Sequence, residues 1–252
     1  MISGLYSAAS GLYAQKMQQE IAAYNLANVN VPGFKQQRVS YESFPDALIR
    51  QTNNVSDLKT VGYVGGGTRM SDIHDIFLEG QITRTDNNLD VALNGDGFFM
   101  VDTVDGIKYT RNGSFRLNQD GDLQTVEGLP VLNQNGNYIT LASENFKIDR
   151  DGSIYENGIL VDTIGVEVFR DPSVLQREGD SLFGFYGDLG NETVPSNNVQ
   201  VMHGYLERSN VEVARELVHM IDVTRAYETC QKMIQTIDNT LDGSVNQVGR
   251  VG

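Results

Sequence analysis

The longest helical pattern of the chain runs from Ser209 to Leu241, with the sequence SNVEVARELVHMIDVTRAYETCQKMIQTIDNTL. Apolar side chains in it follow two lines. The shorter line contains Leu217 and Ile221. Apolar side chains on two faces of a helix indicate contacts on two sides, as in a multi-helix assembly; a long core helix packed on a sheet is the alternative. The main line follows alternating steps of three and four residues and is called the apolar seam: Val213, Glu216, Met220, Val223, Tyr227, Cys230, Ile234, Ile237 and Leu241.

Both ends of this helix also have sequence signals. Ser209 and Asn210 are favourable N-cap residues, and Glu212 follows Ser209 by three positions, as in a capping box. Gly243, just past the seam, suits a C-terminal stop. The sequence therefore predicts a helix of about 32 residues, roughly 48 Å long, which needs a partner of similar length.

A second helix is predicted near the N-terminus, over residues 3–28, where apolar side chains recur on two adjacent lines. It is expected to end near Asn28 to Asn30, because Pro32 disfavours helical geometry at the residue before it. Because the two long helices lie at opposite ends of the sequence, they are expected to pair antiparallel. Together they would form one discontinuous domain of residues 1–30 and 208–252.

The segment between the helices divides in two by its pattern. Residues 31–75 are mostly polar and predict an extended linker or a pair of hairpins. Residues 76–207 predict a β domain built as an antiparallel meander. The predicted fold class is α+β, with a discontinuous terminal α-helical coiled-coil domain and an inserted, mainly antiparallel β domain. Turn dipeptides at steps of seven and eight residues separate the strands: Asp105-Gly106, Asn112-Gly113, Asp120-Gly121, Glu127-Gly128 and Asn135-Gly136.

The composition excludes several functional classes. The chain has 19 Lys and Arg residues against 33 Asp and Glu, a formal net charge of −14, which disfavours nucleic-acid binding because no basic patch is present to neutralise phosphates. No run approaches the roughly 18 apolar residues of a membrane-spanning helix, so direct membrane insertion is not expected. The N-terminus lacks the basic start of a cleaved signal peptide, so any export is expected to use another route.

No group of residues has the spacing of a catalytic, metal or cofactor site. The three histidines lie in different segments, and the single cysteine, Cys230, lies on the apolar seam, which favours a packed residue over a nucleophile. Asn118, Asp120 and Asp122 resemble the start of a calcium loop, but Leu123 stands where that loop requires Gly, so a hairpin turn is predicted. We therefore expect neither an enzyme nor a bound cofactor.

Four segments resemble the bacterial flagellar rod and hook proteins, the axial family of the flagellar basal body. The sequence NLANVNVPGFK, from Asn25 to Lys35, resembles the family's N-L-A-N segment and the G-F-K turn that follows it. The segment from Ser209 to Glu228 is similar to the family's closing helix. The sequences LDVALNGDGFF (Leu89 to Phe99) and YTRNGSF (Tyr109 to Phe115) are similar to its central β motifs, whereas residues 140–200 match none.

The resemblance implies a structural subunit of the basal-body rod. Such a subunit polymerises helically, with its terminal helices in the inner layers of a tube, into the axial drive shaft that transmits torque to the hook. The implied partners are other copies of the chain, neighbouring rod and hook proteins, and the flagellar type III export apparatus. The small β domain favours a rod protein over a hook protein. The sequences from Met1 to Leu5 and from Gly33 to Arg38 look more like the distal rod protein, whereas the segment 50–67 is short for it, so the distal rod is favoured narrowly over the proximal rod.

The residues expected to contact neighbouring subunits lie in the two terminal signatures. Asn25 and Asn28 are expected to cap the first helix or to bond across subunits, and Gly33 with Phe34 to set the turn that leaves it. Arg225 is expected to make polar contacts with a neighbouring subunit. The predicted interface residues are Asn25, Asn28, Gly33, Phe34, Met220, Val223, Arg225, Tyr227 and Ile234.

Two other functional classes remain open from the sequence alone. A secreted adhesin with a β head on a helical stalk would share the pattern of helices and strands, and it would form a stable oligomer in dilute solution. A polysaccharide-acting enzyme would need two carboxylates in a cleft of the acidic β domain.

Overall fold

The computed structural model describes residues 2–43, 47–52, 58–64, 66–143, 145–187, 189–195 and 198–248. The chain divides into two compact units. Unit 1 contains Met1–Leu26, Gln37–His74 and Val213–Gly252, and unit 2 contains Ala27–Gln36 and Asp75–Glu212. Both terminal segments therefore belong to unit 1, and the short segment after the first helix belongs to unit 2.

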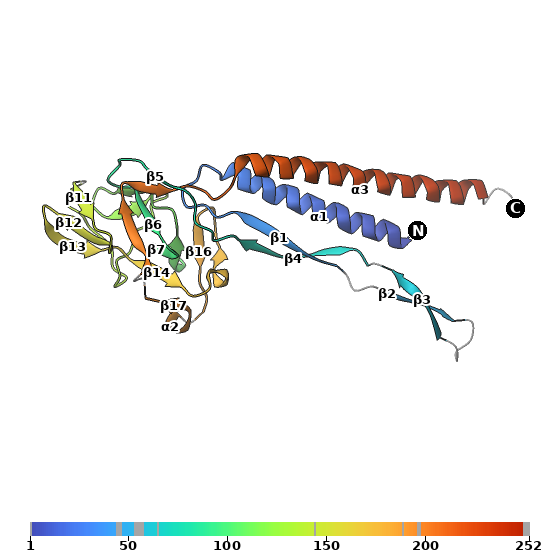
Figure 1. Cartoon of the computed structure of the whole chain (residues 1–252), viewed down its shortest axis with the longest axis horizontal. Helices are drawn as coiled ribbons and strands as arrows, with labels where there is room; N and C mark the ends of the chain where they lie inside the picture. The colour runs from blue at the N-terminus through green and yellow to red at the C-terminus, as the bar shows by residue number, and fades with distance from the viewer. Residues whose placement is uncertain are drawn as a thin grey trace. The chain divides into compact units, whose positions relative to one another are not determined.

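Unit 1 holds both long helices, which run antiparallel and side by side (Figure 1). A Cβ atom placed on Gly4 would lie 3.9 Å from Cδ1 of Ile237, and one on Gly11 would lie 3.6 Å from Sγ of Cys230. The first turns of one helix thus face the last turns of the other, which confirms the antiparallel pairing. The elements of unit 1 are α1 (Ile2–Ala27), β1 (Gln37–Ser43), β2 (Ala47–Thr52), β3 (Leu58–Val64), β4 (Thr68–Asp75) and α3 (Val213–Val248).

The four strands of unit 1 form two pairs, β1 with β4 and β2 with β3. The second pair is antiparallel, with Ala47 opposite Val64. The first pair is bonded to α1, because the Tyr41 hydroxyl donates to the carbonyl of Ala14 at 2.8 Å and the Thr68 amide donates to Oγ of Ser10 at 3.1 Å. Four strands are thus assigned between Gln37 and Asp75.

Unit 2 contains the other strands, and every strand pair assigned in it is antiparallel. Its largest sheet has six strands in the order β15-β16-β8-β7-β14-β17, a second sheet has the order β11-β12-β13, and three further pairs are β10-β9, β18-β6 and β19-β5. The strands are β5 (Ile82–Arg84), β6 (Val91–Asn94), β7 (Gly97–Thr103), β8 (Gly106–Thr110), β9 (Phe115–Leu117), β10 (Leu123–Thr125), β11 (Phe146–Ile148), β12 (Ser153–Glu156), β13 (Ile159–Thr163), β14 (Val166–Phe169), β15 (Gln176–Arg177), β16 (Leu182–Gly184), β17 (Thr193–Val194), β18 (Gln200–His203) and β19 (Tyr205–Glu207). Two short helices, η1 (Pro172–Val174) and α2 (Leu189–Glu192), lie among the last strands.

Two groups of buried apolar side chains form the core of unit 2. The larger group gathers residues from β6, β7 and β9 to β12, including Phe99, Phe115 and Ile154. The smaller group is aromatic, with Phe98, Tyr109 and Phe183 among its members. Successive residues of β7 enter different groups, since Phe98 and Phe99 point to opposite faces of their strand. The combination of two helices with mostly antiparallel strands confirms the α+β class.

The strand order of unit 2 differs from a simple meander. β7 pairs with β8, which follows it, but also with β14, far along the chain. The predicted hairpin turn at Asn112-Gly113 is wrong, because β8 and β9 on its two sides belong to different sheets. Gly113 is needed there for close approach: its carbonyl accepts from the Val91 amide at 2.9 Å, and an added Cβ would lie 1.6 Å from the Val91 carbonyl oxygen.

The predicted ends of the C-terminal helix are also wrong. The helix begins at Val213 and continues past Gly243 to Val248. Asn210 does not cap it, because Oδ1 of Asn210 accepts from the Gln36 amide at 2.7 Å and its Nδ2 donates to the Ile76 carbonyl at 2.7 Å. The side chain of Asn210, which would suit a helix cap, therefore joins the segments at Gln36 and Ile76 within unit 2.

Candidate subunit-interface site

Asn25 joins three segments of unit 1 at the C-terminal end of α1. Its side chain is buried, and Nδ2 donates to the Gln37 carbonyl at 2.9 Å and to Oε1 of Glu216 at 3.0 Å. Its Oδ1 accepts from the Gln37 amide at 2.9 Å. This one carboxamide therefore fixes both the path of β1 as it leaves α1 and the position of the first turn of α3 beside it. Glu216, the one charged member of the apolar seam, is buried because it accepts this bond.

The seam residues of α3 differ in how much of each side chain remains exposed. Val223 is buried, whereas Met220, Tyr227 and Ile234 are partly exposed. Arg225 is exposed. A single copy of unit 1 thus covers the seam completely at Val223 and only in part along the following turns.

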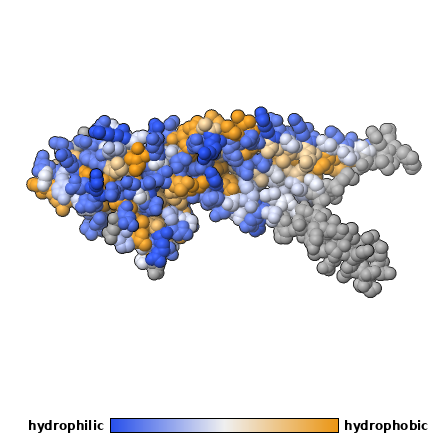
Figure 2. Space-filling view, viewed as in Figure 1, coloured by the Kyte–Doolittle hydropathy of each residue, from blue (hydrophilic) through white to orange (hydrophobic). Residues whose placement is uncertain are grey.

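A second apolar surface lies on the opposite side of α3, over its first turns (Figure 2). Leu217, Val218 and Ile221, together called the outer patch, are 43%, 59% and 52% exposed. These side chains lie roughly 120–220° around the helix axis from Val223. Helix α1 exposes Tyr6 and Tyr13, seven residues apart and therefore on one face. The second apolar line seen in the sequence is therefore uncovered in one copy of the chain.

Gly33 and Phe34 are buried within unit 2. Gly33 has φ +68°, and its amide donates to the Glu207 carbonyl at 2.8 Å. A Cβ there would lie 2.3 Å from the carbonyl carbon of Arg111, so this position has room only for glycine. The ring of Phe34 lies 4.7 Å from the guanidinium carbon of Arg177, whose Nη2 donates to the Lys35 carbonyl at 2.6 Å. Asn28, on the approach to this turn, is also buried in unit 2.

A buried charge cluster, consisting of Lys35, Arg111 and Glu207, lies beside this turn. Nζ of Lys35 is 2.7 Å from Oε1 of Glu207, and Nη1 of Arg111 is 3.3 Å from its Oε2. All three side chains are almost fully buried. Burial lowers the pKa of Lys35 and the pKa of Arg111, and the Glu207 carboxylate opposes both shifts.

Sequence reasoning missed this cluster. Lys35 and Arg111 each lie inside a segment that resembles the rod and hook family, which singled out the two segments but not the role of the charges. Glu207 is 172 positions from Lys35, and no local pattern marks it as their partner. The available signal was Lys35, a charged residue that directly follows the apolar turn sequence from Val31 to Phe34.

The part of the chain that the structure describes offers no alternative site of two common kinds. It holds no group of three or more His, Cys, Asp or Glu side chains arranged to bind a metal ion. No helix among the same residues is both long and apolar enough to cross a membrane. Asn118 and Asp122 are used in the predicted hairpin turn between β9 and β10, where Oδ1 of Asn118 accepts from the Asp122 amide at 2.8 Å.

Comparison with known proteins gives matches along most of the chain. Residues 5–35 match the model "Flagella basal body rod protein", residues 92–170 match "Flagellar hook protein FlgE/F/G D1 domain", and residues 202–248 match "Flagellar basal body rod FlgEFG protein C-terminal". The flagellar basal-body rod protein FlgG of Buchnera aphidicola (subsp. Acyrthosiphon pisum) is 38% identical over 256 residues, which cover 96% of this chain and 98% of that protein. The chain belongs to the flagellar rod and hook protein family.

Other relatives in the family are similar over the whole chain. The flagellar basal-body rod protein FlgF of Caulobacter vibrioides is 32% identical over 254 residues, covering 100% of this chain and 99% of that protein. The flagellar hook-basal body complex protein FlhO of Bacillus subtilis is 31% identical over 271 residues, covering 100% of both. These are structural proteins of the flagellar basal body and not enzymes, which agrees with the expectation from the sequence.

Proposed function

We propose that this chain is a structural subunit of the distal rod, which polymerises helically into the axial drive shaft and transmits torque to the hook. The rod role is supported by relatives named as basal-body rod proteins. FlgG is the distal rod protein and FlgF the proximal one. The distal position is supported by the upper values of identity, since the FlgG relatives are 31–38% identical and the FlgF relatives 31–32%. The proposal includes export through the flagellar apparatus and contact with neighbouring rod and hook proteins.

The observation that carries this proposal is the exposed outer patch on α3. One face of α3 already packs on α1, and the outer patch on another face stays exposed, so a second molecule can cover it. Burying apolar surface contributes roughly 25 cal/mol per Å², which favours contact with a second helix pair. When different surfaces of identical subunits meet without closing a ring, the contact repeats into a helical filament. Repeated contacts of this kind make the terminal helices a multi-helix coiled coil in the assembled rod.

The nine predicted interface residues then have two kinds of role. The buried ones act inside their own subunit: Asn25 positions α3 against α1, while Gly33 and Phe34 anchor the segment after α1 in unit 2. Arg225 and Tyr227 retain exposed surface and make contacts between subunits. Arg225 lies one turn beyond Ile221, so its guanidinium borders the outer patch.

The test places a charge in the outer patch. Leu217→Asp and Ile221→Asp are each expected to abolish incorporation into purified basal bodies, because a carboxylate cannot be buried between helices without a partner. The control is Val104→Asp, which adds the same charge at an exposed apolar position in the β7–β8 turn of unit 2. Incorporation of both patch variants at the wild-type level would overturn the proposal. Thermal unfolding of unit 2 is expected to be unchanged in all three variants.

A further inference from the structure

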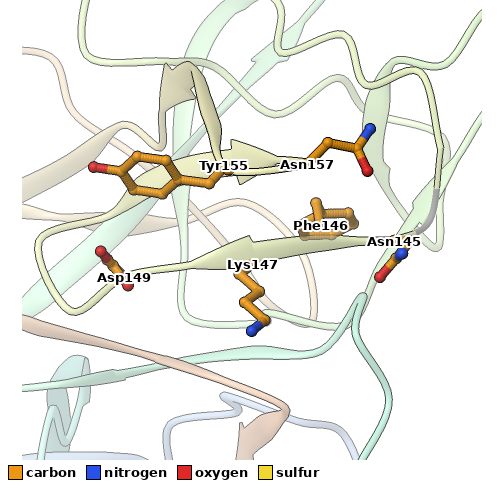
Figure 3. A pocket seen from close by; sticks show the side chains of 7 residues that line it. Asn145, Phe146, Lys147, Asp149, Tyr155 and Asn157 are labelled. Carbon is orange, nitrogen blue, oxygen red and sulfur yellow. The ribbon is translucent and has the colours of Figure 1, made fainter.

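The three-stranded sheet of unit 2 carries a cavity of about 410 Å³, which is lined by none of the nine predicted interface residues (Figure 3). This volume lies within the range of roughly 300–1,000 Å³ that is typical of small-ligand pockets. The cavity lies along β11 and β12 and includes the turn that follows β12. Its lining consists of Asn145, Phe146, Lys147, Asp149, Tyr155, Asn157 and Gly158.

Strand register places the polar lining residues on one face of the sheet. Lys147 is directly opposite Tyr155 in the antiparallel pair of β11 and β12. Because alternate residues of a strand share a face, residues 145, 147 and 149 lie on the same side as Tyr155, while Ile148 points into the core. Figure 3 shows Tyr155 and Asp149 at one end of the cavity, with the amides of Asn145 and Asn157 at the other.

The polar groups of this lining are not used by the protein itself. Within the described residues, the side chains of Asn145, Lys147, Asp149, Tyr155 and Asn157 form no hydrogen bond or ion pair with another protein group. Asn157 is held at φ +50° in the turn between β12 and β13, so its position is fixed by the backbone rather than by a side-chain contact. The cavity therefore presents charged and uncharged hydrogen-bond donors and acceptors on one sheet, and all of them are open to a ligand.

We propose that this cavity binds an uncharged saccharide chain. The hydroxyl groups of a sugar are both donors and acceptors, which matches the two amides, the Asp149 carboxylate and the Lys147 ammonium. The C–H face of a sugar ring is slightly positive and packs against the negative face of an aromatic ring, here that of Tyr155. Leu160, opposite Tyr155 on β13 and 55% exposed, extends this apolar floor to a second sugar ring.

Other ligand classes fit the lining less well. An anionic ligand would meet one cation, Lys147, beside the Asp149 carboxylate, on a chain of net charge −14. A purely apolar ligand would displace water from the amide and charged groups without replacing the hydrogen bonds that the water made. A saccharide replaces those bonds and covers the aromatic ring at the same time.

Isothermal titration calorimetry of the full chain with chitotetraose and with cellotetraose tests this assignment. Saturable binding of at least one of them is expected, with a Kd of about 1 mM or tighter. Tyr155→Ala is expected to weaken binding about tenfold, through loss of the aromatic platform. Asn157→Gly, which preserves the positive φ of the turn, is expected to weaken it about threefold. Tyr138→Ala is the matched control, because Tyr138 is also exposed on unit 2 but lies outside the cavity.

A second readout locates the site. In ¹H–¹⁵N spectra of the full chain, shift changes on adding the oligosaccharide are expected at residues 145–149 and 155–160. The assignment is overturned if neither oligosaccharide binds at about 10 mM. It is equally overturned if Tyr138→Ala reduces affinity as much as Tyr155→Ala, or if the shift changes fall elsewhere. These measurements use the unassembled chain, so they do not depend on whether it is built into the rod.

Discussion

Nδ2 of Asn25 donates a hydrogen bond of 3.0 Å to Oε1 of Glu216, although 191 positions separate the two residues. Asn25→Asp replaces this donor with a carboxylate oxygen that faces the Glu216 carboxylate and the Gln37 carbonyl. We expect the free energy of unfolding of unit 1 to fall by about 3 kcal/mol, because two buried acceptors then face each other. Urea unfolding followed by circular dichroism at 222 nm measures this change in the helices.

Asn30→Asp is the control for this substitution. Asn30 is exposed, so the same added charge is expected to change stability by less than about 0.5 kcal/mol. Equal effects of the two variants would show that net charge, and not the bond to Glu216, is responsible.

The buried charge cluster predicts an asymmetry between its members. Glu207→Gln leaves Lys35 and Arg111 without their carboxylate and is expected to destabilise unit 2 by about 3–5 kcal/mol. Lys35→Met leaves the pair of Glu207 and Arg111 intact and is expected to cost less than half as much. Near-ultraviolet circular dichroism in urea reports on the aromatic core of unit 2.

An exposed ion pair supplies the control for the cluster. The side chains of Glu42 and Arg69 are 54% and 62% exposed, so Glu42→Gln is expected to leave stability almost unchanged. A larger loss for Lys35→Met than for Glu207→Gln would contradict the charge arrangement described above.

Tyr109 predicts the response of unit 2 to alkaline pH. Burial raises the pKa of Tyr109 to about 12 from its ordinary value of 10.0. The folded state therefore keeps the phenol proton after the unfolded chain has lost it, so this stabilisation is complete below pH 10 and is lost progressively as pH rises through 12. A pKa difference of two units between the folded and unfolded chain corresponds to about 2.7 kcal/mol of unfolding free energy.

Tyr109→Phe removes this titration, so the unfolding free energy of the variant is expected to fall less steeply than that of the wild type between pH 10 and 12. Urea unfolding at four pH values from 9 to about 12 measures the two slopes. Parallel slopes for the two proteins would rule out the contribution of Tyr109.

Tyr227 lies on the seam of α3 and remains partly exposed. Tyr227→Ala is expected to abolish assembly and to leave the melting of unit 2 unchanged, because the proposed assembly places the ring against a neighbouring subunit. Sedimentation of assembled material and calorimetric melting give the two readouts. Tyr227→Phe is expected to assemble, since it keeps the ring; joint loss of assembly and of unit 2 melting in the alanine variant would instead indicate a role in folding.

The periodic parts of this fold were predictable from local sequence. Helical spacing located both long helices and their antiparallel pairing, because an apolar seam of such length needs a partner of matching length. The second apolar line, with Leu217 and Ile221, also proved to be exposed in a single copy. These features depend on residues close together in the chain.

The features that sequence reasoning missed depend on residues far apart. Asn210 has the chemistry of a helix cap, yet its side chain bonds to Gln36 and Ile76, more than 130 positions away. Gly113 follows an asparagine as in a hairpin turn, yet it is needed because Val91 passes close to it. The local sequence predicts a helix cap at Asn210 and a hairpin turn at Gly113. Contacts with distant segments determine the actual role of each residue.

The pairing of α1 with α3 also sets the order in which the molecule can be completed during synthesis. Unit 2 ends at Glu212, so all of its residues are synthesised before any part of α3. Throughout that time α1 has no partner helix, and the outer patch does not yet exist. A product truncated before Val213 lacks both α3 and the outer patch, so in the proposed assembly it is expected to be left out of the growing rod.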